Sequence, residues 1–124
     1  MMTTEVQSSL SFTQTVELVR GAIEAAGLKI ISTIDAQENL KKIGLQIGGN
    51  KIIEVFHPKM AKEVFDKGIR AGIVPPLRIY VFEDAGKTHV MAQSAAELFS
   101  PYNGLSDLAR RVDGMLDSVV RAVK

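Results

Sequence analysis

A histidine followed by a proline is the feature of this 124-residue sequence best placed to do chemistry. Pro58 predicts the first turn of a helix, because proline is tolerated at that position. His57 is therefore expected at a helix N-terminus, where backbone N–H groups attract anions and an imidazole could act as a base or a hydrogen-bond donor. The simpler hypothesis, which we favour, is that His57 caps the helix as an asparagine would.

A metal site would need several ligands, and His89 is the only other histidine in the chain. Glu54 on a predicted strand and Glu83 in the hairpin loop are expected near His89, so two histidines and two carboxylates could bind a divalent cation. The chain has no cysteine, however, and none of the usual zinc or calcium motifs. An exposed polar strand explains His89 more simply, and we expect neither a metal nor a cofactor.

The common signatures of nucleophilic catalysis and phosphate binding are missing too. The sequence has no Gly-x-Ser-x-Gly elbow and no Gly-x-x-x-x-Gly-Lys-Ser/Thr loop. We therefore assign no catalytic residue, and the sequence favours a binding module over an enzyme.

Side chains that alternate along three predicted strands form the second group of candidates. Successive side chains of a strand point to opposite faces of a sheet, and one face of each of these strands is purely aliphatic. The other face is expected to carry a mixed set: Glu54, Phe56, Arg78, Tyr80, Phe82, His89 and Met91. A solvated sheet face would be more polar than this set, and a large apolar patch usually marks an interface or a binding groove.

We expect the mixed face to be a homodimer seam, a ligand-binding saddle, or both. The candidate ligand-binding residues on it and beside it are His57, Tyr80, Arg78 and Glu54. The alternative is that loops, or the segment around Pro101 and Tyr102, cover this face within one chain.

Apolar periodicity and turn residues predict the elements that position these candidates. Strands are expected at residues 4–9, 28–34, 51–56, 77–82 and 88–93, with a hairpin loop at residues 83–87. Helices are expected at residues 12–26, 36–43, 58–67 and 105–123, with a short helical turn after residue 94. One hairpin and few strand–helix–strand units favour an α+β fold, with a mainly antiparallel sheet and the long helices on one face.

Capping patterns support three of the predicted helix starts. Ser11, Asp35 and Ser94 each precede a glutamine or glutamate by three residues, as is typical of a helix N-terminus. The charges on the last helix alternate in sign, except that Asp113 and Asp117 are expected to repel each other.

Length and composition indicate one domain over residues 1–124 of a soluble protein. The chain has 15 Lys and Arg against 14 Asp and Glu, and a net charge of +1 lacks the basic surplus of a nucleic-acid-binding protein. No apolar run reaches the roughly 20 residues of a membrane span, and the first residues lack a secretory pattern. We therefore expect a cytoplasmic protein without a nucleic-acid or membrane partner.

Three segments, in this order and at this spacing, resemble one protein family. They are residues 56–61 (Phe-His-Pro-Lys-Met-Ala), residues 72–75 (Gly-Ile-Val-Pro) and residues 79–87 (Ile-Tyr-Val-Phe-Glu-Asp-Ala-Gly-Lys), within a similarity over residues 12–120. They are similar to the bacterial and archaeal family called domain of unknown function 302. The resemblance implies a small α+β fold like one repeat of the TATA-binding-protein fold, often a homodimer, and no assigned activity.

The chain departs from the pattern of that family at two places. The family commonly has Asn-Pro where this chain has His57-Pro58, and it often has Leu-Pro-Cys where this chain has Val74-Pro75-Pro76. Any chemistry that depends on that cysteine is absent here.

Two functions remain open on the sequence. The first, which we favour, is a homodimeric module that binds a small ligand without catalysis. The second is an enzyme that uses His57 as a base, with Glu54 or Tyr80 nearby. A pocket at His57 that also contains an acid or a donor would favour the enzyme, whereas a shallow or filled site would favour the module.

Overall fold

The protein is built on one antiparallel sheet of five strands, which confirms the predicted α+β class. The computed structural model describes residues 5–124, so residue 4 of the first predicted strand lies outside the described residues. The strands are β1 (Glu5–Ser8), β2 (Lys29–Asp35), β3 (Asn50–Phe56), β4 (Leu77–Asp84) and β5 (Lys87–Ala92). They lie in the order β1-β5-β4-β3-β2, so β4 is central and β1 and β2 are the edges.

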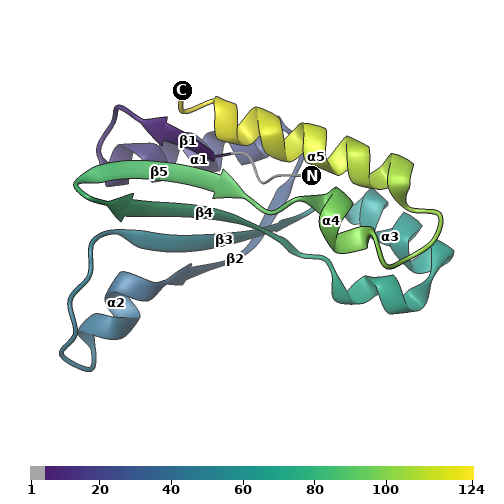
Figure 1. Ribbon diagram of the computed structural model, residues 1–124, viewed down its shortest axis with the longest axis horizontal. Helices are drawn as coiled ribbons and strands as arrows, with labels where there is room; N and C mark the ends of the chain where they lie inside the picture. The colour runs from purple at the N-terminus through teal and green to yellow at the C-terminus, as the bar shows by residue number, and fades with distance from the viewer. Residues whose placement is uncertain (1–4) are drawn as a thin grey trace.

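The two longest helices cover one face of this sheet. α1 (Phe12–Ala25) and α5 (Ser106–Arg121) pack against each other and against β4 and β5 respectively, and Figure 1 shows α5 along the top of the sheet and α1 behind β1 and β5. Six residues that the spacing predicts on their apolar stripes are buried, namely Val16, Val19, Ile23, Leu108, Val112 and Val119, and Leu116 is buried beside them. The strand residues that face these stripes are Ile53, Val55, Ile79, Val81 and Val90, none more than 2% exposed. Each large side chain buried in this core contributes about 1.5–3 kcal/mol.

The remaining helices lie at the two ends of the sheet. α2 (Ala36–Lys41) projects beyond β2 at the lower left of Figure 1. α3 (Pro58–Lys67), the 3-10 helix η1 (Ile69–Ile73) and α4 (Ala95–Phe99) gather at the opposite end. The sequence did not predict η1, because Gly68 and the two prolines after it indicate only where helix α3 must stop.

The three predicted helix caps are confirmed. Ser11 Oγ accepts a hydrogen bond from the N–H of Gln14, whose side chain in turn accepts one from the N–H of Ser11. The side chains of Asp35 and Ser94 accept the equivalent bond from the residue three positions ahead. Local sequence is enough to fix these starts, because each cap and its donor lie within one turn.

The turn between β4 and β5 is shorter than the predicted loop. Ala85 and Gly86 form it alone, with φ values of 51° and 77°, while Asp84 pairs directly with Lys87. Positive φ at both central residues is the type I′ geometry, whose twist suits an antiparallel hairpin. The strands are therefore longer than predicted, and their register is fixed up to the turn.

Asp113 of α5 holds the start of α4, a role that the sequence did not predict. Its carboxylate accepts hydrogen bonds from the N–H groups of Ala95 at 2.6 Å and Ala96 at 3.1 Å, and Ser94 Oγ lies 3.5 Å from it. A negative charge at a helix N-terminus is favourable. Because the carboxylate of Asp113 is engaged by α4, the repulsion expected between it and Asp117 is offset.

We expect Asp113→Ala to lower the free energy of unfolding by about 1–3 kcal/mol, because two N–H groups of α4 lose a charged acceptor. Asp66→Ala is the matched control, since Asp66 lies far from a helix N-terminus and forms an exposed ion pair with Lys62 on α3, and such pairs contribute at most about 1 kcal/mol. Urea unfolding followed by circular dichroism measures both variants. Equal losses would show that Asp113 stabilises the protein no more than a surface charge does.

Candidate functional site

The sheet face turned away from α1 and α5 carries the predicted mixed set apart from Phe56, which lines the cavity beside His57. We call it the open face and define it by seven side chains of the three central strands: Ile52, Glu54, Arg78, Tyr80, Phe82, His89 and Met91. The opposite faces of the same strands are buried in the core, so the predicted division into an aliphatic and a mixed face is confirmed. The register places Tyr80 between Ile52 and Met91, with Arg78 beside Glu54. Three of the four candidate residues are thus brought together.

The segment that could have covered the open face within one chain lies elsewhere. Tyr102 connects α4 to α5 and packs against the core. Figure 1 shows this connection at the right-hand end of the molecule, away from β3, β4 and β5. The alternative in which residues 101 and 102 cover the mixed face is therefore wrong.

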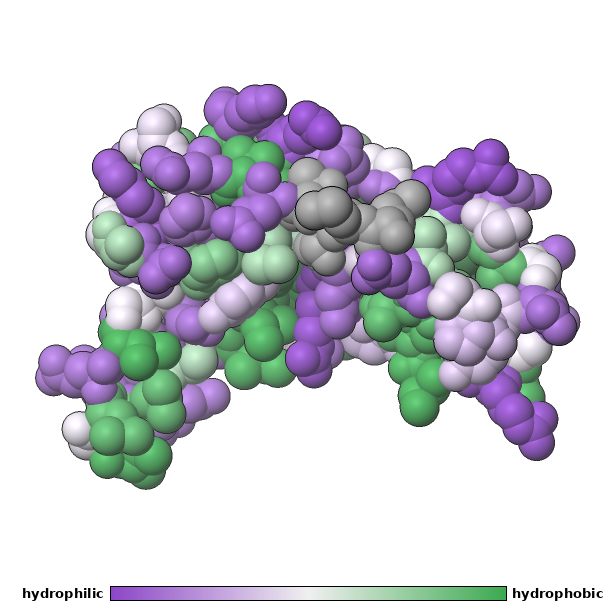
Figure 2. All heavy atoms as spheres, viewed as in Figure 1, coloured by the Kyte–Doolittle hydropathy of each residue, from purple (hydrophilic) through white to green (hydrophobic). Residues whose placement is uncertain are grey.

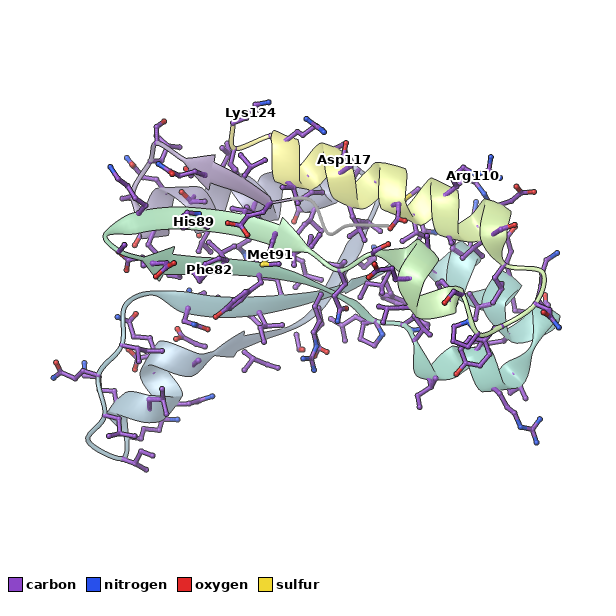
Figure 3. All side chains as sticks on the ribbon, viewed as in Figure 1. Phe82, His89, Met91, Arg110, Asp117 and Lys124 are labelled. Carbon is purple, nitrogen blue, oxygen red and sulfur yellow. The ribbon has the colours of Figure 1, made fainter. Side chains whose placement is uncertain are left out.

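Three rings stack along the open face. The ring centroids of Tyr80 and Phe82 are 4.6 Å apart with 20° between the ring planes, and those of Phe82 and His89 are 5.2 Å apart with 16°. An aromatic pair of this kind contributes about 0.5–1.5 kcal/mol beyond the area that it buries. Figure 3 shows Phe82, His89 and Met91 next to one another over β4 and β5. The stack orients the ring of Tyr80 without any ligand.

The side chains of Tyr80 and Arg78 lean in different directions. Nδ2 of Asn50 donates a hydrogen bond to the hydroxyl of Tyr80 at 2.5 Å, and Asn50 is the register partner of Phe82. Both partners of Tyr80 therefore lie on its hairpin side. Arg78, two residues earlier on β4, places its Nε 3.5 Å from Oε2 of Glu54 on β3. The side chains of Tyr80 and Arg78 therefore point away from each other along β4.

A hollow of about 270 Å³ opens on the open face where these side chains part. Its lining consists of Asn50, Ile52, Arg78, Tyr80, Met91, Ala92 and Gln93. Apolar and polar side chains are combined there, as is typical of sites for small ligands. The sequence analysis did not include Asn50 and Gln93. Gln93 lies within the predicted strand 88–93, on the same side as His89 and Met91, and could have been added to the mixed set. Asn50 lies one residue before the predicted strand 51–56, so extending the alternation by one residue would have found it.

Glu54 and Gln93 already have partners on the sheet. Ser32 Oγ donates a hydrogen bond to Oε1 of Glu54 at 2.6 Å. Oε1 of Gln93 accepts a hydrogen bond from the backbone N–H of Arg78 at 3.0 Å. The acceptor atoms of both side chains are therefore occupied, and Glu54 is not among the residues that line the hollow.

His89 does not meet the carboxylates that were expected near it. Its Nδ1 lies 3.3 Å from Oε2 of Glu5 on β1. Glu83 instead accepts a hydrogen bond from the N–H of Gly49 at 2.6 Å, because the turn before β3 passes beside it. Residues 5–124 contain no group of three or more histidine, cysteine, aspartate or glutamate side chains arranged to hold a metal ion.

His57 lies apart from the open-face residues. It occupies the N-cap position of α3, as predicted, but its side chain makes no capping hydrogen bond, so the prediction that it caps the helix is wrong. The ring lines an apolar cavity of about 30 Å³, together with Phe56, Met60 and Leu108. Nδ1 is buried and has no hydrogen-bond partner among the described residues. An imidazole is bulkier than the side chain of asparagine, and here the ring packs among apolar groups instead of bonding to the first turn.

The cavity beside His57 contains no second group for acid–base chemistry. Its other lining residues are all apolar: Leu28, Val55, Phe56, Met60, Ala61, Val64, Pro75, Leu77, Phe99, Leu108, Val112 and Leu116. A volume of about 30 Å³ holds little more than one water molecule. The cavity beside His57 is therefore nearly filled by apolar side chains.

Exposed apolar side chains flank the open face at both ends of the sheet. At the end near α2 they are Ile34, Ile43, Leu45 and Ile47, which are 37–70% exposed. At the end near η1 they are Phe65, Ile69 and Ile73, which are 43–80% exposed. Figure 2 shows hydrophobic atoms gathered at the lower left, over α2 and the loop after it. We call these two groups the flanking projections.

None of the helices in residues 5–124 combines the length and the apolar character that crossing a membrane requires.

Comparison with known proteins identifies the family and the fold. No curated protein matches the chain. A crystal structure of an uncharacterized conserved protein DUF302 from Bacillus stearothermophilus has the same fold, with a TM-score of 0.92 over 100% of this chain and 99% of that one at 20% sequence identity. The family model described as domain of unknown function DUF302 matches residues 3–123. The chain therefore belongs to the DUF302 family.

Proposed function

We propose that the protein is a homodimeric module that binds a small ligand at the open face. The composition of that face carries the proposal. A stack of three rings, a methionine and an arginine–glutamate pair stand where a solvated sheet face would carry small polar and charged side chains. Apolar surface of this kind marks an interface or a binding groove, and the hollow beside Tyr80 supplies a place for a ligand.

A second copy of the chain is the partner that this surface favours. A twofold interface uses the same patch twice, so a single self-complementary face is enough to form it. Ile52, Tyr80, Phe82 and Met91 are half-buried in one copy, so each would gain only part of the about 1.5–3 kcal/mol that full burial of a large apolar side chain contributes. The flanking projections extend the apolar surface at both ends of the sheet. A second copy lying across the open face would also close the hollow against water.

Native mass spectrometry of protein purified from its own host tests both parts of the proposal. The expected species has twice the chain mass of 13.5 kDa and retains a small ligand. A species of 13.5 kDa without any added mass would contradict both the dimer and the ligand.

We expect Phe82→Asp to raise the dissociation constant of the dimer at least about 10-fold, because it places an unpaired charge in the seam. Sedimentation velocity over a range of concentrations measures the shift toward monomer. Leu18→Asp is the matched control, since Leu18 is 40% exposed on α1 and lies off the open face. If the double variant Tyr80→Asp, Phe82→Asp still sediments as the wild-type dimer, the interface lies elsewhere, and the exposed side of α5 is the next surface to test.

An enzyme with His57 as its base is the second candidate function. One observation favours it, namely a buried imidazole nitrogen without a hydrogen-bond partner among the described residues, since most buried polar atoms in proteins have one. The apolar lining of the cavity counts against it, because a base that transfers a proton needs a substrate within reach and a group that orients it.

We expect His57→Phe to raise the free energy of unfolding by about 1 kcal/mol, because an unpaired buried polar group costs about 1–3 kcal/mol. His57→Asn should be close to neutral, since the gain of a capping bond offsets the loss of ring packing. Urea unfolding measures both variants. A clear loss of stability in His57→Phe would show that Nδ1 has a binding partner, and the enzyme would then become the leading hypothesis.

A further inference from the structure

The polar groups that line the hollow are donors more than acceptors. Arg78 makes no hydrogen bond through its guanidinium within residues 5–124, and its contact with Glu54 involves Nε, so the fork of two terminal nitrogens remains free. Because Oε1 of Gln93 is held by the N–H of Arg78, the amide NH2 of Gln93 has no partner among those residues. The nearest carboxylate, Glu54, is engaged by Ser32 and lies outside the lining.

The hydroxyl of Tyr80 adds a further donor. It accepts a hydrogen bond from Nδ2 of Asn50, so its own hydrogen is not used in that contact. If the amide of Asn50 is turned the other way, Tyr80 donates and the NH2 of Asn50 becomes the unused donor. In either orientation this pair, which lines the hollow, keeps donor hydrogens for a ligand.

One face of the Tyr80 ring is also available to a ligand. Phe82, two residues later on β4, covers the face on the hairpin side at a centroid distance of 4.6 Å. The other face is directed toward Arg78, two residues earlier, and the hollow lies between them. The apolar side chains of Ile52 and Met91 flank this space on the neighbouring strands. A flat apolar group would continue the ring stack there.

We propose that the ligand of the hollow is a small carboxylate with a planar apolar body. Its ring stacks on the free face of Tyr80, and its carboxylate pairs with the terminal nitrogens of Arg78 and the amide of Gln93. Arginine suits this role because its planar fork matches a carboxylate through two parallel hydrogen bonds. The inference rests on the proposed function, for which it names the class of ligand.

The experiment is a titration of the full-length, 15N-labelled protein followed by amide chemical shifts, with benzoate as the probe. A molecule as small as benzoate is expected to bind weakly, so its concentration is raised to about 20 mM. We expect benzoate to shift the amides of Arg78, Tyr80 and Gln93. Benzamide, which keeps the ring and removes the charge, should bind at least 10-fold more weakly. Cyclohexanecarboxylate and inorganic phosphate, which lack the flat ring, should also bind more weakly.

Two variants test the roles of the side chains. Gln93→Glu keeps the acceptor that holds the N–H of Arg78 and replaces the free NH2 by a carboxylate oxygen, so we expect at least a 10-fold loss of benzoate affinity with the fold unchanged. Arg78→Gln should cause a similar loss. Arg121→Gln is the matched control, because Arg121 pairs with Asp117 on α5 and should leave the affinity unchanged.

The possible failures are distinguishable. Equal binding of benzoate and benzamide, equal binding of benzoate and phosphate, or unchanged affinity in Gln93→Glu would overturn the carboxylate proposal. Absence of any shift with benzoate, in a protein that sediments as a dimer through the open face, would overturn the ligand class and leave the dimer standing. A monomer without shifts would overturn the proposed function as well.

Discussion

The burial of one face of the sheet beneath α1 and α5 is the constraint on which the rest of the structure depends. Side chains alternate between faces along a strand, so Ile79 and Val81 can be buried only if Tyr80 and Phe82 point away from the helices. A slip of one residue would exchange the two sets. The tight turn at Ala85 and Gly86 prevents that slip, because it fixes which residues of β4 and β5 lie opposite each other. The packing of the core therefore determines which side chains lie on the open face.

What the sequence could predict follows from the range of each interaction. Alternation within a strand and caps within one helical turn are local, so Glu54, Arg78, Tyr80 and the cap at Ser11 were found without the structure. Asp113 was missed because its partners are 17 and 18 residues away, on an element whose packing the sequence does not specify.

Only some members of the site were predictable, namely Arg78, Tyr80 and Met91, and its shape was not. The hollow exists because Tyr80 leans toward Asn50 and Phe82 while Arg78 leans toward Glu54. These choices of rotamer depend on contacts between neighbouring strands, which the pattern of a single strand does not contain. His57 shows the same limit, since Pro58 was enough to place its backbone at the N-cap and the direction of its ring was decided by the apolar surroundings.

The likeness to the Bacillus stearothermophilus protein separates what the fold requires from what a site requires. A TM-score of 0.92 at 20% identity means that most side chains differ while the backbone is kept. Aliphatic cores tolerate such exchange when volume and pattern are maintained, so the shared fold places no demand on the open face and carries no ligand with it. Function in this chain must therefore be argued from its own side chains, above all Arg78, Tyr80 and Gln93.

Binding of the proposed ligand would depend on the proposed dimer more than the dimer would depend on the ligand. The hollow of about 270 Å³ is slightly smaller than the roughly 300–1,000 Å³ of small-molecule sites, and it is open to water on one side. Its ring stack and hydrogen bonds are already formed, so a ligand would not have to order Tyr80 or Gln93 on binding. One copy lacks a surface that covers the hollow and excludes water, and hydrogen bonds to Arg78 gain strength only when water is excluded. A second copy across the open face would cover the hollow in this way. The proposed seam would need no ligand, since its apolar side chains would favour association without one.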